Sequence, residues 1–348
     1  MNLLYTRVGD WMQRELIEWY ELNKRDLPWR HSEEPYNIWI SEIMLQQTMV
    51  DTVIPYYLRF IDRFPDINTL AMASLEEVYK YWEGLGYYRR ARFIHENAAF
   101  LHENNDDTFP DEYEEILGLK GIGRYTAGAI CSIAYKMPIP AVDGNVLRVI
   151  SRFYCIDENI ALDKTVKMIE NKVNELIKGY DPSAFNQGLM DLSAAICKVK
   201  NPDCMMCPLN KECLAFRNHQ ENVLPIRMKK VKKKEIHYIT GIVTKGECFL
   251  LIKNGKGLLE NLYGFVQYEC DSPYIYIDYF ESEYGRSLRV ESFIKRIKHV
   301  FSHRTWIMDV YHFEIEDTIE NMYTKKEIEL LPISTAHLKV YKAFLKKD

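Results

Sequence analysis

The 348-residue sequence lacks any apolar run long enough to cross a membrane, and charges interrupt the apolar pattern of its first sixteen residues. A membrane-spanning helix needs about 20 predominantly apolar residues, and a secretory signal peptide needs an apolar stretch free of charges. We therefore expect no membrane partner and a location in the cytoplasm.

An excess of positive charge is also missing. The 45 Lys and Arg residues are outnumbered by 50 Asp and Glu residues, which gives a formal net charge of −5. This balance counts mildly against a nucleic-acid partner, but such a partner requires only a local basic face. Two basic stretches could supply one, YYRRAR at 87–92 and RMKKVKKKE at 227–235.

No internal repeat or low-complexity tract is present, and the length suits two domains. Residues 1–216 show helical apolar spacing with Gly and Pro stops, whereas the last third is β-branched and aromatic with partial alternation. We expect a mainly α domain at 1–224 and an α+β domain at 236–348. Between them, residues 225–235 combine one proline with many like charges, which is typical of an exposed linker.

The sequence contains eight cysteines. Because we expect a cytosolic protein, they are unlikely to form structural disulfides. Four of them share one short stretch with the spacing Cys-x6-Cys-x2-Cys-x5-Cys, namely Cys197, Cys204, Cys207 and Cys213. Four thiolates in one loop suit a tetrahedral zinc or a four-iron cube. Zinc sites more often pair two tight Cys-x2-Cys knuckles, and only one is present, so the unequal arms favour the larger cluster.

Two carboxylates stand among apolar residues. Glu42 lies within WISEIML at 39–45, and Asp143 lies within PAVDGNVL at 140–147. Desolvation raises a carboxyl pKa, and hydrogen bonds to the charged form lower it. One pair of acids can thereby divide into proton donor and anionic stabiliser for sugar-bond cleavage. The alternatives are a structural acid at Glu42 and a helix N-cap at Asp143.

Gly121 and Gly123 precede a small-residue helix in LKGIGRYTAGAI. Backbone N–H groups exposed at a helix N-terminus form a phosphate site. A tight turn between two helices explains the glycines equally well. A dinucleotide site would need a preceding strand and a longer glycine pattern, and neither is present.

Seven stretches, in order along the chain, carry a family resemblance: LPWR, PYNIWISEIMLQQT, WEGLGYYRRAR, GIGRYTAGAI, AVDGNVLRV, FNQGLMDL and the four-cysteine loop. Together they resemble the MutY family of adenine DNA glycosylases, in the helix-hairpin-helix base-excision superfamily. The resemblance covers about residues 10–216 and resumes more weakly at GLLENLYGF and HVFSH. It implies two helical modules with DNA between them, and excision of adenine mispaired with 8-oxoguanine or G by a monomer bound to nucleoid DNA.

The resemblance also implies roles for single residues. Glu42 matches the acid that protonates adenine at N7, and Asp143 matches the carboxylate that stabilises the oxocarbenium sugar. Tyr125 and Asn145 match residues that support this chemistry. The four cysteines match the ligands of a 4Fe–4S cluster that orders a DNA-contacting loop.

Further positions match DNA-contacting residues of the family, with the glycine turn facing the DNA backbone. A base must leave the stack before it can be excised, and the gap must be filled. Gln47, Leu85 and Tyr87 match residues that fill or probe the duplex around the flipped base. Trp29, Arg30 and Gln187 match residues of the adenine pocket. For Tyr87, a core aromatic is the alternative.

Tyr125 separates two branches of the superfamily. The similar endonuclease III branch carries a lysine here, whose amine can form a Schiff base with the sugar and cleave the strand. A tyrosine cannot, so we expect a monofunctional glycosylase rather than an endonuclease III-like pyrimidine glycosylase. A non-catalytic iron–sulfur DNA-binding protein would need neither Glu42 nor Asp143.

The C-terminal domain resembles that of the same family, which is related to Nudix hydrolases. The Nudix metal helix needs an Arg-Glu and a Glu-Glu pair, but in DYFESEYG Asp278, Tyr279 and Ser282 replace three of these residues and only Glu283 is left. A hard cation needs several oxygen ligands. We therefore expect no nucleotide hydrolysis, which argues against a Nudix hydrolase.

Phe301, Ser302 and His303 match the family loop that probes the 8-oxoguanine strand, with a plain β-turn as the alternative. Val266 follows LYGF where the family usually has proline. The body of this domain matches weakly, so lesion preference rests on fewer residues than adenine excision does.

Overall fold

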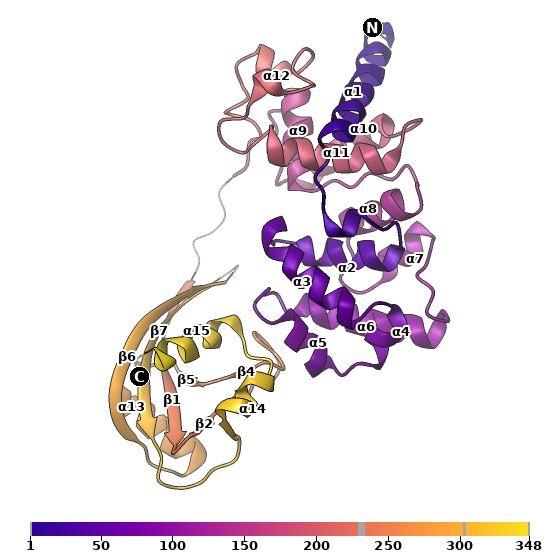
Figure 1. Cartoon of the computed structure of the whole chain (residues 1–348). Helices are drawn as coiled ribbons and strands as arrows, with labels where there is room; N and C mark the ends of the chain where they lie inside the picture. The colour runs from indigo at the N-terminus through magenta and orange to yellow at the C-terminus, as the bar shows by residue number, and fades with distance from the viewer. Residues whose placement is uncertain (1, 229–233, 302–303, 347–348) are drawn as a thin grey trace. The chain divides into compact units, whose positions relative to one another are not determined.

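The computed structural model describes residues 2–228, 234–301 and 304–346, with side chains from residue 10 onward. The chain divides into two compact units (Figure 1). The first comprises residues 1–72 and 93–229, and the second comprises residues 73–92 and 230–348.

The first unit is helical. Its long elements are α1 (Asn2–Asn23), α2 (Pro35–Leu45), α3 (Val50–Arg63), most of α6 (Arg89–Asn104), α8 (Arg124–Ala134), α9 (Gly144–Phe153), α10 (Asp163–Leu176) and α11 (Pro182–Ala195). The short ones are η1 (Pro28–Arg30), α4 (Ile67–Met72), α7 (Tyr113–Gly118), η2 (Cys204–Met206) and α12 (Leu214–Arg217). Proline at the first turn starts both α2 and α11, where its missing N–H costs no helical hydrogen bond.

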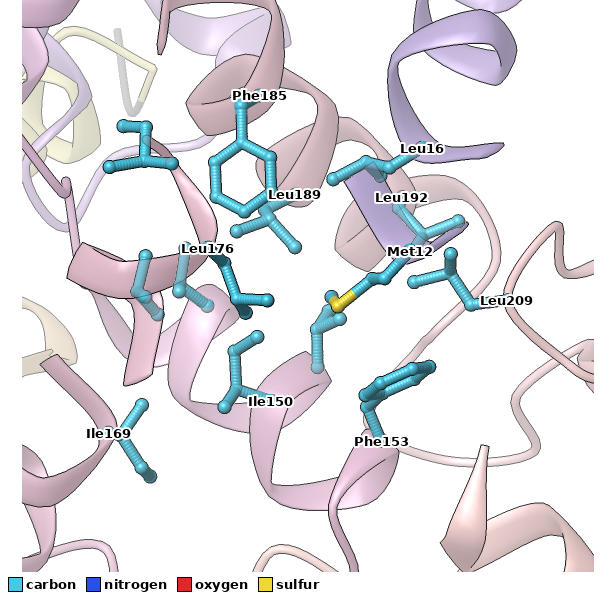
Figure 2. Packing of buried hydrophobic residues seen from close by; sticks show 14 of the residues in the cluster. Met12, Leu16, Ile150, Phe153, Ile169, Leu176, Phe185, Leu189, Leu192 and Leu209 are labelled. Atoms are coloured by element: carbon cyan, nitrogen blue, oxygen red, sulfur yellow. The ribbon is translucent and has the colours of Figure 1, made fainter. Parts of the chain in front are cut away.

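Apolar side chains from α1, α9, α10 and α11 form one core of this unit (Figure 2). Met12 and Leu16 of α1 meet Ile150 of α9 and Leu189 of α11, and all four are fully buried. This core fixes the start of α9 and the inner face of α11, both of which carry predicted site residues.

The second unit combines α5 (Leu75–Trp82) with a mixed sheet and three further helices. The strands are β1 (Lys234–Lys245), β2 (Cys248–Leu250), β3 (Ile252–Lys253), β4 (Tyr263–Gly264), β5 (Val266–Tyr268), β6 (Arg289–Val300), β7 (Arg304–Glu314) and β8 (Met322–Thr324). The helices are α13 (Pro273–Tyr284), α14 (Lys325–Leu330) and α15 (Thr335–Leu345). The main sheet runs β6-β7-β1-β2-β8, with β5 also paired to β1.

Both faces of this sheet are covered. β1 pairs parallel with β7, and β7 pairs antiparallel with β6. Ile236 and Ile242 of β1 pack with α15 residues, whereas Ile239 and Val243 pack with Tyr276 and Phe280 of α13. Strand side chains alternate between faces, so one strand contributes to two apolar layers.

The predicted fold class is confirmed: a mainly α region is followed by an α+β region built on a mixed sheet. The sequence did not indicate that residues 73–92 belong with the second unit. Residues 229–233, in the middle of the predicted linker, lie outside the described residues. In the part of the chain that is described, no helix has the length and apolarity that a membrane crossing requires.

Candidate active site

Glu42 is buried in α2, with 6% of its surface exposed. Its Oε2 accepts a hydrogen bond of 2.9 Å from the Tyr125 hydroxyl of α8, the helix that packs against α2. Burial raises the pKa of Glu42 to about 7, against the lowering effect of the Tyr125 hydrogen bond. A carboxyl group with this pKa is protonated in about half of the molecules at pH 7, which suits a general acid at neutral pH.

Asp143 caps the N-terminus of α9. Its Oδ1 accepts from the backbone N–H groups of Asn145 (2.8 Å) and Val146 (2.9 Å), and its Oδ2 accepts from Asn145 Nδ2 (2.7 Å). Burial raises the pKa of Asp143, and these hydrogen bonds offset part of the rise. The capping alternative is therefore correct, and the cap also gives this carboxylate three donors that favour its charged form.

Asp143 acts on Glu42, because its charge contributes to the raised pKa of Glu42. Both also raise the pKa of Tyr125, after burial as the largest cause. One acid is thus held by a single hydroxyl in an apolar helix, and the other by three N–H groups. This contrast separates a proton donor from an anion.

A cavity of about 410 Å³ opens beside Glu42. Four other predicted residues line it, namely Trp29, Arg30, Tyr125 and Gln187. Trp29 packs edge-on against Tyr57, with ring centroids 5.4 Å apart, and Gln187 Nε2 donates to Ser183 Oγ. The volume and the mixed aromatic and polar wall suit a planar heterocyclic base.

The two glutamines after α2 differ in placement. Gln46 Nε2 donates to Thr126 Oγ1 at 3.1 Å, which joins the end of α2 to α8. Gln47 is exposed and adopts a left-handed backbone, with φ of 60°. Its side chain is therefore available to a partner outside the unit.

The glycine turn joins α7 to α8. Gly121 has φ of 77°, and a Cβ there would lie 2.4 Å from Phe93 Cδ2. Gly123 is the N-cap of α8. The alternative of a tight helix–helix turn is confirmed, and the turn leaves the first N–H groups of α8 at a helix start, where an anion binds favourably.

Leu85, Tyr87 and Phe301 lie in the second unit. Leu85 is buried, whereas Tyr87 is 46% exposed with φ of 51°. The alternative of a core aromatic at Tyr87 is therefore wrong, and the buried aromatic is its neighbour Tyr88. Arg90 lies over the Tyr87 ring at 5.4 Å and over the Trp82 ring at 5.2 Å.

Phe301 begins the connection between β6 and β7, and its N–H donates to Arg304 O at 2.8 Å. Its ring packs against Trp306 at 4.7 Å and His299 at 4.6 Å. Phe301 and Tyr87 line one cavity of about 660 Å³. Ser302 and His303 lie outside the described residues.

Cys197, Cys204, Cys207 and Cys213 line one small cavity with the apolar side chains of Val149, Phe153 and Leu209. Arg152 is buried and donates from Nη1 to Cys197 Sγ at 3.2 Å. Burial, with the neighbouring thiols, raises the pKa of Cys204 to about 11 and of Cys207 to about 12, so these thiols stay protonated unless a metal replaces the proton. Across the described residues, no three His, Cys, Asp or Glu side chains form a site for a single metal ion.

Three site residues escaped the sequence analysis. Asp191 of α11 accepts hydrogen bonds from two arginines, and Arg148 of α9 links Asn145 Oδ1 (3.2 Å) to the Cys197 carbonyl (2.8 Å). Arg152 contacts a cysteine sulfur. Asp191 and Arg148 lie within quoted stretches, FNQGLMDL and AVDGNVLRV, but a surface charge on a helix explains such residues equally well in sequence.

Residues 40–179 match the model of the HhH-GPD superfamily of base excision DNA repair proteins. A thermostable thymine-DNA glycosylase shares this architecture, with a TM-score of 0.57 and 28% identity over 62% of this chain and 99% of that one. The fold and the match to this superfamily thus define a base-excision glycosylase domain.

Two relatives named adenine DNA glycosylase are more similar in sequence. That of Buchnera aphidicola subsp. Baizongia pistaciae is 39% identical over 73% of this chain and 72% of its own length. That of Buchnera aphidicola subsp. Schizaphis graminum is 36% identical over 83% and 84%. The chain belongs to the adenine DNA glycosylase family, a family of enzymes that hydrolyse N-glycosidic bonds.

Proposed function

We propose that this protein binds duplex DNA as a monomer and removes adenine mispaired with 8-oxoguanine, and with G, by hydrolysis of the N-glycosidic bond. The observation that carries the proposal is Glu42 at the wall of a cavity of base size, with Asp143 close enough for its charge to raise the pKa of Glu42. Glu42 is held by Tyr125 and has its pKa raised to about 7, and Asp143 is held by three N–H donors.

The proposed reaction follows from these two environments. With the adenosine flipped into the cavity, Glu42 transfers its proton to adenine N7. The C1′–N9 bond breaks, its electron pair leaves with adenine, and the Asp143 carboxylate stabilises the oxocarbenium ion. Water then adds to C1′ and gives a proton to the Glu42 carboxylate, which restores the acid, so the products are free adenine and an abasic site.

The absence of strand cleavage is part of the proposal. Tyr125 occupies the position where the resemblance places a lysine in strand-cleaving relatives, and a phenol forms no Schiff base. Borohydride reduction during reaction with a lesion duplex tests this point. We expect no covalent protein–DNA adduct, and efficient trapping would contradict the monofunctional assignment.

We further propose that the four cysteines hold a 4Fe–4S cluster. All four line one cavity with an apolar wall, and Arg152 lies against one sulfur, as hydrogen bonding to a charged cluster requires. When bound, the cluster supplies structural order rather than chemistry on the base. Metal analysis of purified protein distinguishes four irons from one zinc.

Recognition of 8-oxoguanine is proposed for the second unit. Tyr87, the residue predicted to fill the duplex, and Phe301, the first residue of the predicted lesion-probing loop, line the same large cavity of this unit. The resemblance of this unit to Nudix-related domains rests on the sequence.

Excision measured on duplexes with A:8-oxoG, A:G, T:G and thymine glycol tests the function. Wild-type protein is expected to release adenine only, and faster opposite 8-oxoguanine. Glu42→Gln keeps the shape of the side chain but carries no transferable proton, so we expect a loss of roughly 10²-fold or more. Normal adenine release by Glu42→Gln would show that this residue is not the acid.

A further inference from the structure

A carboxylate on α11 binds two arginines that line the active-site cavity. Asp191 lies one helical turn after Gln187, and its side chain is 2% exposed. Its Oδ1 accepts from Arg25 Nε (2.9 Å) and Nη2 (2.6 Å), and its Oδ2 accepts from Arg30 Nη1 (2.7 Å). Burial alone would raise the pKa of Asp191, but the hydrogen bonds and charges of Arg30 and Arg25 outweigh it and hold the pKa below its usual value. Asp191 is therefore an anion.

Arg30 is held on several sides. Besides its bond to Asp191, its Nη1 donates to the Arg25 carbonyl at 3.1 Å, and its guanidinium lies 5.5 Å from the Tyr20 ring. The side chain is 13% exposed, and its buried Nε has no hydrogen-bond partner among the described residues. Arg30 lines the cavity with Glu42 and is a cation whose charge acts on that acid.

The groups that act on Glu42 come from three elements: Tyr125 of α8, Asp143 at the start of α9, and Arg30 of η1. Other charged groups on the cavity wall pair among themselves, as Glu21 with Lys24, Asp26 with His31, and Glu33 with Lys136. Asp181 caps α11. The cluster of Arg25, Arg30 and Asp191 is different, because two cations share one anion.

We propose that Asp191 is a positioning residue for adenine excision: it fixes Arg30 at the wall of the cavity that Glu42 lines, and it balances the charges of Arg25 and Arg30. The inference rests on the proposed function, in which Glu42 protonates adenine. It assigns Asp191 an effect on where the reaction operates on the pH scale.

The test is the pH dependence of single-turnover adenine release from an A:8-oxoG duplex. In Asp191→Asn the arginine charges are uncompensated and favour the Glu42 carboxylate. The midpoint pH at which the rate declines should therefore decrease by about half a pH unit or more. Arg25→Gln removes one cation from an exposed position, so the midpoint pH of the decline in rate should increase, by a smaller amount. The double variant Asp191→Asn with Arg25→Gln restores the charge balance and should return the midpoint pH towards the wild-type value.

Glu175→Gln is the matched control, because it breaks an exposed carboxylate–lysine pair outside the cavity and should leave the profile unchanged. Thermal unfolding of each variant establishes that the fold is kept, and Arg25→Gln carries the test by itself if Asp191→Asn does not fold. An unchanged profile in both single variants, or an equal loss at every pH, overturns the role of Asp191. Failure of wild-type protein to release adenine instead overturns the proposed function.

Discussion

Burial of Glu42 links reactivity to stability at the scale of one residue. The pKa rises from its ordinary value of 4.5 to about 7 in the fold. The folded state therefore binds this proton more tightly than the unfolded chain does. The contribution of Glu42 to the free energy of unfolding is therefore largest at low pH and decreases as pH rises from about 4.5 to about 7. Above that range the full loss is roughly 3 kcal/mol.

Glu42→Gln removes this titration. We expect the variant to gain roughly 1–3 kcal/mol of unfolding free energy at about pH 8 relative to wild type, and little or nothing at about pH 4.5. Urea unfolding at the two pH values measures the difference. An equal effect at both would mean that Glu42 is not desolvated in the folded protein.

Asp143 caps α9 and has a proposed role in catalysis, and one substitution separates the two. Asparagine caps helices as well as aspartate does, so Asp143→Asn should change the unfolding free energy by less than about 1 kcal/mol. It removes the charge that stabilises the oxocarbenium ion, so excision should fall by about 10²-fold or more. Asp143→Ala should lose the cap as well, at about 0.5–2 kcal/mol. Thermal unfolding and single-turnover assays distinguish the two variants.

Glu42 and Asp143 could be selected from their apolar surroundings and the four cysteines from their spacing, whereas Tyr125 followed from the family resemblance; their roles stay predictions. Asp191 could not be predicted, because its partners Arg25 and Arg30 are more than 150 positions away in sequence and only the packing of α1 on α11 brings them together. A charge at the end of an amphipathic helix is usually solvated, and nothing local distinguishes this one.

At the scale of elements, the turn between α7 and α8 depends on one glycine. Gly121→Ala would place a methyl group against Phe93 in a left-handed backbone, and we expect a loss of roughly 1–3 kcal/mol of unfolding free energy. Gly118→Ala is the control, since no atom lies within 4 Å of its added Cβ and no left-handed backbone is required. A similar stability for both variants would contradict the strained turn.

The connection between β6 and β7 permits a second test. Phe301→Ala removes a ring that packs on Trp306 and His299 at the wall of the Tyr87 cavity. We expect the preference for A:8-oxoG over A:G to shrink several-fold, while the excision rate on A:G changes little. Phe293→Ala, at a half-exposed site on β6, the strand that precedes Phe301, should leave the preference unchanged. The ratio of the two single-turnover rates gives the answer.

Helices and strands followed from local pattern, because apolar spacing and capping residues act over a few positions. The sheet order did not. β1 pairs with β7 across more than sixty residues, and a parallel pair carries no turn signal that would fix its register.

Charge is the property that matters for the whole molecule. A net charge of −5 requires that DNA binding use local basic surface. Affinity for the lesion duplex should therefore fall steeply between about 50 mM and 200 mM salt, with a linear dependence of log K on log salt concentration. Fluorescence anisotropy titrations measure the slope, and an affinity independent of salt would rule out phosphate contacts as the main source of binding.

The second unit is assembled from two stretches that are far apart in the sequence. Residues 73–92 join residues 230–348, and bonds such as Arg92–Glu260 and Tyr88 Oη to Ile333 O hold them together. A ribosome adds about 5–20 residues per second. The segment with Tyr87 therefore waits on the order of ten seconds for its partners to be synthesised. During translation this unit is completed last, and a nascent chain that is released early lacks the surroundings of Tyr87.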